Sequence, residues 1–121
     1  MSGIALRFML TGIGFLLFGM LLGVHMGISE DHSLSPVHAH LNLVGGLMFM
    51  IFALFYHTVP ESALGIYCRA HYWLSLAGVV TLAPGIAMTL VGGGPGLAIL
   101  GSLLTLASVG FFAVVLLRHR G

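Results

Sequence analysis

The chain has 121 residues, of which 59% are hydrophobic and only 6% are charged. Its mean hydropathy of +1.13 lies far outside the balance of a soluble domain, because so short a chain cannot hide that much apolar surface from water. The net charge of +1 comes from four Arg and three acidic residues, with no Lys. So few basic residues exclude a basic surface for nucleic acid. The apolar composition favours an integral membrane protein.

Cysteine usage narrows the chemistry further. Cys68 is the single cysteine, which excludes an internal disulfide, a Cys-x-x-Cys redox pair and a Cys-x-x-Cys-His site for covalent haem. Any cofactor must therefore be held by side chains other than thiols.

The first expected element is a helix over residues 3–27. Arg7 precedes an apolar run from Met9 to Val24, so a signal peptide is the alternative interpretation. The run is longer than the ~7–15 apolar residues typical of a signal peptide, and no Ala-x-Ala-like cleavage site follows it. We therefore expect a retained transmembrane helix, followed by a short acidic connection at a membrane surface.

Three further apolar segments are long enough to cross the ~30 Å hydrocarbon layer as helices. Ser35-Pro36 is a start signal for the second helix, because Ser caps free backbone N–H groups and Pro fits the first helical turn. Pro84 is expected to kink the third helix, and a glycine-rich turn precedes the fourth. The sequence thus predicts an all-α membrane protein with no soluble domain, a single four-helix transmembrane bundle over residues 1–121 with helices at about 3–27, 36–57, 62–91 and 97–117.

The distribution of charge predicts the orientation. With four crossings, all the Arg residues fall on one side and the acidic connection between the first two helices falls on the other. Because cytoplasmic flanks carry the positive excess, both termini are expected in the cytoplasm, and in a bacterium the membrane would be the inner membrane. The residues that set this orientation are Arg7, Arg69, Arg118 and Arg120 on one side, and Glu30 and Asp31 on the other.

Glycines mark the expected helix contacts. Helices in lipid associate by close packing, which small residues permit, and Gly19, Gly23 and Gly27 recur every four residues along the first helix. One interpretation is ordinary packing of small residues between helices, and the other is a groove that admits the flat face of a cofactor. Further glycines of this kind are Gly12, Gly45, Gly46 and Gly78.

The chain contains seven His, as many as its Arg, Asp and Glu combined, and ionisable residues in membrane segments are costly enough to suggest a function. His57 and His119 lie at cytoplasmic helix ends and need no special account. His71 has Tyr72 and Trp73 beside it, so we interpret it as part of an interfacial aromatic belt. The others are expected near the outer face: His25, His32, His38 and His40.

The pair His38-Ala39-His40 is the most informative of these elements. Residues two apart on a helix point about 200° from each other, so the two imidazoles face different neighbours and cannot ligate one ion together as an i, i+4 pair does. His38 shares its face with Asn42, Gly45 and Phe49, whereas His40 shares its face with Leu43, Val44, Leu47 and Ile51.

Three functions are compatible with this pair. Neutral imidazole binds haem iron, zinc and copper, and haem additionally favours a large apolar wall with small residues where the ring approaches the backbone. These surroundings suit haem b better than a bare ion. The alternatives are a copper or zinc site built from His25, Met26, His38 or His40, and a structural or assembly subunit of a respiratory complex whose histidines only pack between helices.

The segment from Pro36 to Gly46, Pro-Val-His-Ala-His-Leu-Asn-Leu-Val-Gly-Gly, together with Gly19–Gly27, resembles the small four-helix membrane proteins described as cytochrome oxidase subunit I-like, which in turn resemble the haem–copper oxidases. The resemblance is strong over about residues 19–60 and faint elsewhere. In the large oxidase subunit, twelve helices form three equivalent groups of four, and a His-x-His pair ligates both haems.

The resemblance implies roles for single residues. His38 matches the ligand of the high-spin haem and His40 that of the low-spin haem, near the periplasmic face. A homotrimer would replace the three groups of helices, with each subunit offering His38 to one neighbour and His40 to the other. Each interface could then hold a b-type haem between imidazoles of different chains, and a redox partner would exchange electrons with it.

The departures from the oxidase pattern limit the expected activity. The sequence lacks the His-Pro-Glu-Val-Tyr helix and the adjacent His-His pair that build the copper centre of true oxidases. Oxygen reduction is therefore not expected. A haem with both axial positions filled favours electron transfer or haem handling over catalysis.

Overall fold

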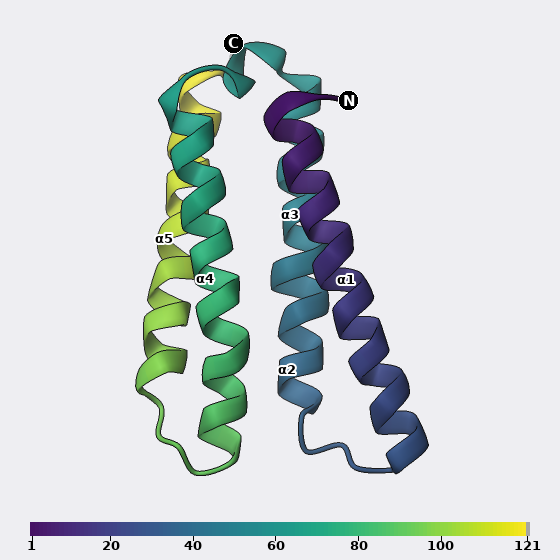
Figure 1. The fold of residues 1–121 in the computed structure, drawn as a ribbon. Helices are drawn as coiled ribbons and strands as arrows, with labels where there is room; N and C mark the ends of the chain where they lie inside the picture. The colour runs from purple at the N-terminus through teal and green to yellow at the C-terminus, as the bar shows by residue number, and fades with distance from the viewer. Residues whose placement is uncertain (121) are drawn as a thin grey trace.

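The computed structural model of the protein describes residues 1–120 and consists of four long helices (Figure 1). The second long helix, Ser35–Thr58, changes its hydrogen-bonding pattern partway and so carries three labels. In chain order the elements are α1 (Gly3–Ser29), α2 (Ser35–His40), the π-helical η1 (Leu41–Leu47), α3 (Met48–Thr58), the 3-10 turn η2 (Pro60–Ala63), α4 (Ile66–Leu90) and α5 (Gly96–Arg118).

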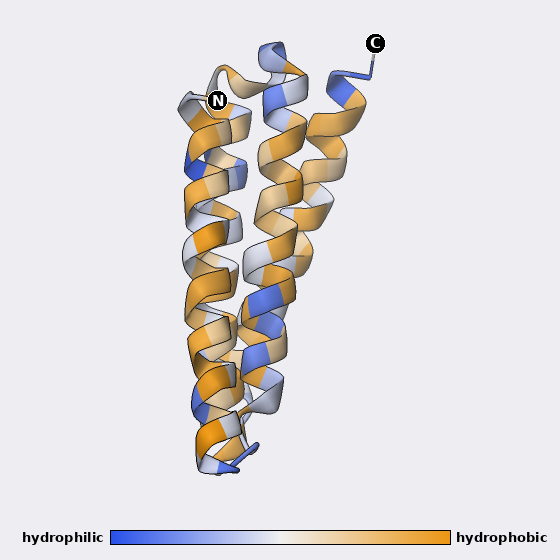
Figure 2. Cartoon of the chain, turned by 90° about the vertical axis from the view of Figure 1, so that its right-hand side faces the viewer, coloured by the Kyte–Doolittle hydropathy of each residue, from blue (hydrophilic) through white to orange (hydrophobic). Residues whose placement is uncertain are grey.

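All four long helices are candidate membrane spans. They contain 27, 24, 25 and 23 residues, against the ~20 that a helix needs to cross the hydrocarbon layer. Figure 2 shows hydrophobic residues over most of the bundle's length. The prediction of an all-α membrane protein is confirmed in two respects: the described residues form four long helices, and each helix is long and apolar enough to cross a membrane.

The helices form two antiparallel hairpins, α1 with the second long helix and α4 with α5 (Figure 1). Glycines bring each pair together. A Cβ on Gly12 would lie 3.0 Å from the Phe49 Cβ, and one on Gly78 would lie 2.7 Å from Thr105 Oγ1. The first interpretation of the glycines, close packing of helices, is therefore confirmed for these positions.

Aromatic side chains join the two hairpins at the end of the bundle that holds residue 3 and Arg118. Phe8 is fully buried there, with its ring centre 5.6 Å from that of Phe52 and 5.0 Å from that of Tyr72. Phe112 of α5 lies 4.7 Å from Phe52, centre to centre. This aromatic cluster links all four long helices.

The helix bounds differ from the expected ones at two places. The third long helix begins at Ile66 and not near Ser62, because Pro60–Ala63 form a 3-10 turn and Gly65 adopts φ +88°, which is outside the helical region. The first helix extends beyond Gly27 to Ser29 and ends where Glu30 turns to φ 58°. α4 continues through Pro84 as one helix.

Candidate site at the start of the second long helix

His38 lies against α1 of its own chain. Its Nδ1 atom is 2.7 Å from the carbonyl oxygen of Gly19, and a Cβ on Gly23 would lie 2.7 Å from its Cε1 atom. The side chain is half-buried. Two of the glycines on α1 therefore form the floor on which this imidazole rests.

His40 points away from α1 and is fixed by its own helix. Its Nδ1 atom lies 2.7 Å from the carbonyl oxygen of Pro36, one turn earlier. The side chain is half-buried, as that of His38 is. The predicted opposition of the two imidazoles is therefore found, with His38 directed inward and His40 outward.

The two hydrogen bonds determine the tautomer of both rings. A backbone carbonyl oxygen can only accept a hydrogen bond, so Nδ1 must carry the proton in His38 and in His40. The lone pair of each neutral imidazole then resides on Nε2. An Nδ1–H bond to a carbonyl is the usual support for a histidine that ligates a metal through Nε2.

Asn42 completes the surroundings of His38. Its Nδ2 atom lies 3.3 Å from both ring nitrogens, and only the unprotonated Nε2 can accept a hydrogen bond from it. The Asn42 Oδ1 atom is buried without a partner. The Asn42 amide is thus the one hydrogen-bond partner that the described residues give to Nε2 of His38.

The other residues predicted to share the face of His38 also contact α1. A Cβ on Gly45 would lie 2.9 Å from the Phe15 ring, and Phe49 is buried with its ring centre 5.4 Å from that of Phe15. Gly45 and Phe49 therefore form a wall between two helices of one chain. The face shared by His40 is turned outward, with Leu43, Leu47 and Ile51 each about half exposed.

Directly after His40 the helix widens into η1, a feature that the sequence analysis did not anticipate. The Met48 N–H donates to the carbonyl of Leu43, five residues earlier. Such π turns are rare and often lie at functional sites. Gly45 and Gly46 in this stretch permit the close approach of Phe15 and Leu16 of α1, which offers a packing reason for the wider turn.

His25 and Met26, at the same end of the bundle, do not join the pair. His25 is exposed, and Met26 beside it is buried in the bundle. Within residues 1–120 there is no group of three or more His, Cys, Asp or Glu side chains that could hold a metal ion.

The interpretation of His71 as an interfacial residue is wrong. The side chain is 0% exposed, with Nδ1 2.9 Å from the Tyr56 hydroxyl and Nε2 buried without a partner. Its ring centre lies 4.5 Å from that of Phe52 and 5.1 Å from that of Phe8. The neighbouring Trp73 is exposed and suited to the belt instead, so the error was to treat adjacent residues of a helix as facing the same way.

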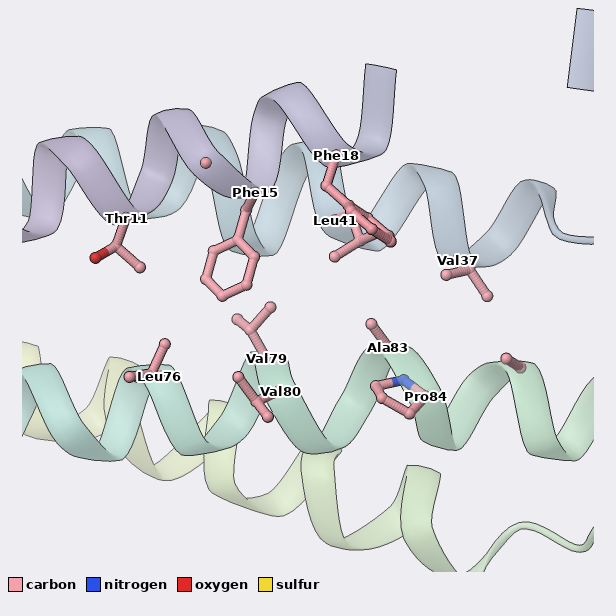
Figure 3. A pocket seen from close by; sticks show the side chains of 12 residues that line it. Thr11, Phe15, Phe18, Val37, Leu41, Leu76, Val79, Val80, Ala83 and Pro84 are labelled. Atoms are coloured by element: carbon pink, nitrogen blue, oxygen red, sulfur yellow. The ribbon is translucent and has the colours of Figure 1, made fainter. Parts of the chain in front are cut away.

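A cavity of about 700 Å³ lies between the two hairpins, from the middle of the bundle toward the loops. Figure 3 shows Phe15 and Leu41 projecting into it from one hairpin, and Val79 and Ala83 from the other. Neither His38 nor His40 lines it. The cavity is therefore separate from the histidine site.

Comparisons with protein families, with characterised proteins and with solved structures give no match to this chain.

Proposed function

We propose that the protein binds haem b at the membrane and that His38 and His40 supply axial imidazoles through Nε2. One observation carries the proposal: both rings have Nδ1 fixed by a backbone carbonyl at 2.7 Å, which directs the lone pair to the opposite edge of the ring. His119 makes the same kind of bond, from Nδ1 to the Val115 carbonyl at 3.0 Å, so the support comes from the two bonds together with the closeness of His38 and His40 in the chain and not from one such bond alone.

The two imidazoles would serve different haems, because they point in opposite directions. His40 lies on an outward face with Leu43 and Leu47, which are 58% and 52% exposed. This apolar face could cover the flat side of a haem or the helix of a second subunit. We therefore propose a homotrimer in which each chain offers His40 to one neighbour and the Nε2 edge of His38, whose Nδ1 edge is held by α1, to the other.

Binding through His38 requires a local exchange. Asn42 donates to Nε2 of His38 over 3.3 Å, a long and weak hydrogen bond. An iron atom would displace this amide, and its N–H groups would be free to bond elsewhere. His40 needs no such exchange and is the residue from which we expect the tighter ligation.

A bound haem would supply a one-electron couple. His38 and His40 would hold and orient the group, the apolar side chains around them would exclude water, and two imidazole ligands would leave no position for oxygen. The proposed role is electron transfer with a redox partner, or haem handling, and not oxygen reduction.

The orientation belongs to the same proposal. Arg7, Arg69 and Arg118 lie at the end of the bundle opposite to His38, and Glu30 and Asp31 lie at the end near it. By the positive-inside rule, the histidine site faces the periplasm if the membrane is a bacterial inner membrane.

The decisive experiment is a reduced-minus-oxidised absorption spectrum of the purified protein after expression with adequate haem. We expect Soret and α bands of a six-coordinate b-type haem, loss of most haem in His38→Ala and His40→Ala, and full retention in His57→Ala. His57 is the matched control because it is exposed on the same long helix but at its opposite end. A wild-type protein without these bands, or with bands that survive both substitutions, overturns the proposal.

A further inference from the structure

The cavity between the hairpins is about as long as the hydrocarbon part of one bilayer leaflet is thick. Along α4 its lining extends from Leu76 to Ala87, which at ~1.5 Å per residue corresponds to about 16 Å. Half of the ~30 Å hydrocarbon layer is about 15 Å. The cavity therefore extends as far along the bundle as a single acyl chain reaches into the membrane.

Its two ends lie at different depths. Val37 is near the start of α2 and Ala87 is near the end of α4, so this end of the cavity lies close to the two loops. Thr11 marks the other end, several residues inside α1. The cavity is open and not enclosed, so it is accessible to lipid along its length.

The lining is suited to a hydrocarbon and not to a polar group. Thr11 is the only one of the twelve lining residues with a polar side chain, and its Oγ1 atom is 2.8 Å from the Tyr72 hydroxyl. The Pro84 ring and the side chains of Phe15 and Val79 form the rest of the wall shown in Figure 3. A ligand with a polar ring at its deep end would find little to bond there.

We propose that this cavity holds the acyl chain of a phospholipid from the leaflet at the loop end, and that the chain fills the space between the hairpins. This lipid site is independent of haem binding. It gives α4 an apolar partner over the stretch where it does not reach α1.

The charges at the loop end indicate which headgroup is preferred. Glu30 and Asp31 are exposed in the connection that leads to α2. The backbone N–H of Ser33 donates to Asp31 Oδ1 at 3.0 Å and lowers the pKa of that carboxyl below its usual 3.8. Because two carboxylates repel an anionic headgroup and attract an amine, phosphatidylethanolamine should be preferred to phosphatidylglycerol.

Gly14 offers a test that fills the cavity without disturbing the fold. It lines the cavity, and a Cβ added to it meets no atom within 4 Å. A phenylalanine at this position can therefore occupy the space meant for the lipid. Gly110 is the matched control, since it is also helical, open at its Cβ position and away from the cavity.

The experiment is native mass spectrometry of protein reconstituted in an equal mixture of phosphatidylethanolamine and phosphatidylglycerol. We expect one retained phospholipid per chain in the wild type and in Gly110→Phe, and at least a fivefold loss in Gly14→Phe, whether or not haem is bound. Equal retention by both variants, or a retained adduct that is not a phospholipid, overturns the site. Preference for phosphatidylglycerol, or a preference unchanged in a Glu30→Gln, Asp31→Asn double variant, overturns the headgroup assignment.

Discussion

At the end of the bundle that holds residue 3 and Arg118, buried aromatic rings fill the space between the two hairpins, whereas toward the loop end this space holds a cavity of about 700 Å³. Phe8 of α1, Phe52 of α3 and His71 of α4 are each 2% exposed or less. The histidine pair lies at the loop end, and both side chains are half-buried. Stability is thus concentrated away from the candidate site, which leaves that site free to accept a ligand or a neighbour.

The first prediction concerns the aromatic cluster around Phe8. Phe8→Ala removes the ring that contacts Phe52, Tyr56 and Tyr72, and should lower the free energy of unfolding by about 3 kcal/mol through the cavity it leaves. Thermal unfolding in detergent measures the loss.

Phe18→Ala is its control, because Phe18 lines the cavity and is 62% exposed. We expect a change of less than about 1 kcal/mol there. Equal losses of unfolding free energy in Phe8→Ala and Phe18→Ala would show that the aromatic cluster does not stabilise the bundle more than the cavity wall does.

The second prediction concerns the glycine floor under His38. In Gly23→Ala the new Cβ would lie 2.7 Å from the imidazole, so the ring or α1 must move, at a cost of about 1–3 kcal/mol. Haem content should fall together with the melting temperature. Gly27→Ala on the same helix meets nothing within 4 Å and should leave both unchanged or slightly improved; equal haem loss in the two variants would count against the role of Gly23.

The third prediction tests whether His71 contributes to stability alone or also to haem binding. Tyr56→Phe removes the hydroxyl 2.9 Å from Nδ1 and leaves both ring nitrogens without partners, which should cost about 1–2 kcal/mol. The double variant Tyr56→Phe, His71→Leu should recover most of this loss, since no polar group is then stranded. Haem content should stay at the wild-type level in both; a drop would mean that His71 takes part in haem binding.

Much of the fold could be predicted from the sequence, because each helix has to cross the same apolar layer and needs the same length of apolar residues. The face shared by His38, Asn42, Gly45 and Phe49 also follows from helical spacing, and the structure brings all four against α1. Which helix they face, in the same chain or in another, does not follow from spacing alone.

Other features depend on contacts that a single sequence does not reveal. The burial of His71 arises from rings on α1, α3 and α5 that meet it from distant positions in the chain. The π turn at Leu41–Leu47 depends on how closely Phe15 approaches Gly45. The carbonyl partners of His38 and His40 are likewise visible only once the helices are placed.

The most direct test of the haem proposal is chemical rescue of a missing ligand. We predict that His40→Gly lacks the low-spin b-type spectrum and that free imidazole restores it, because the space and the neighbouring wall remain while only the Nε2 donor is lost. A His40→Gly variant with an unchanged low-spin spectrum before imidazole is added would contradict the account.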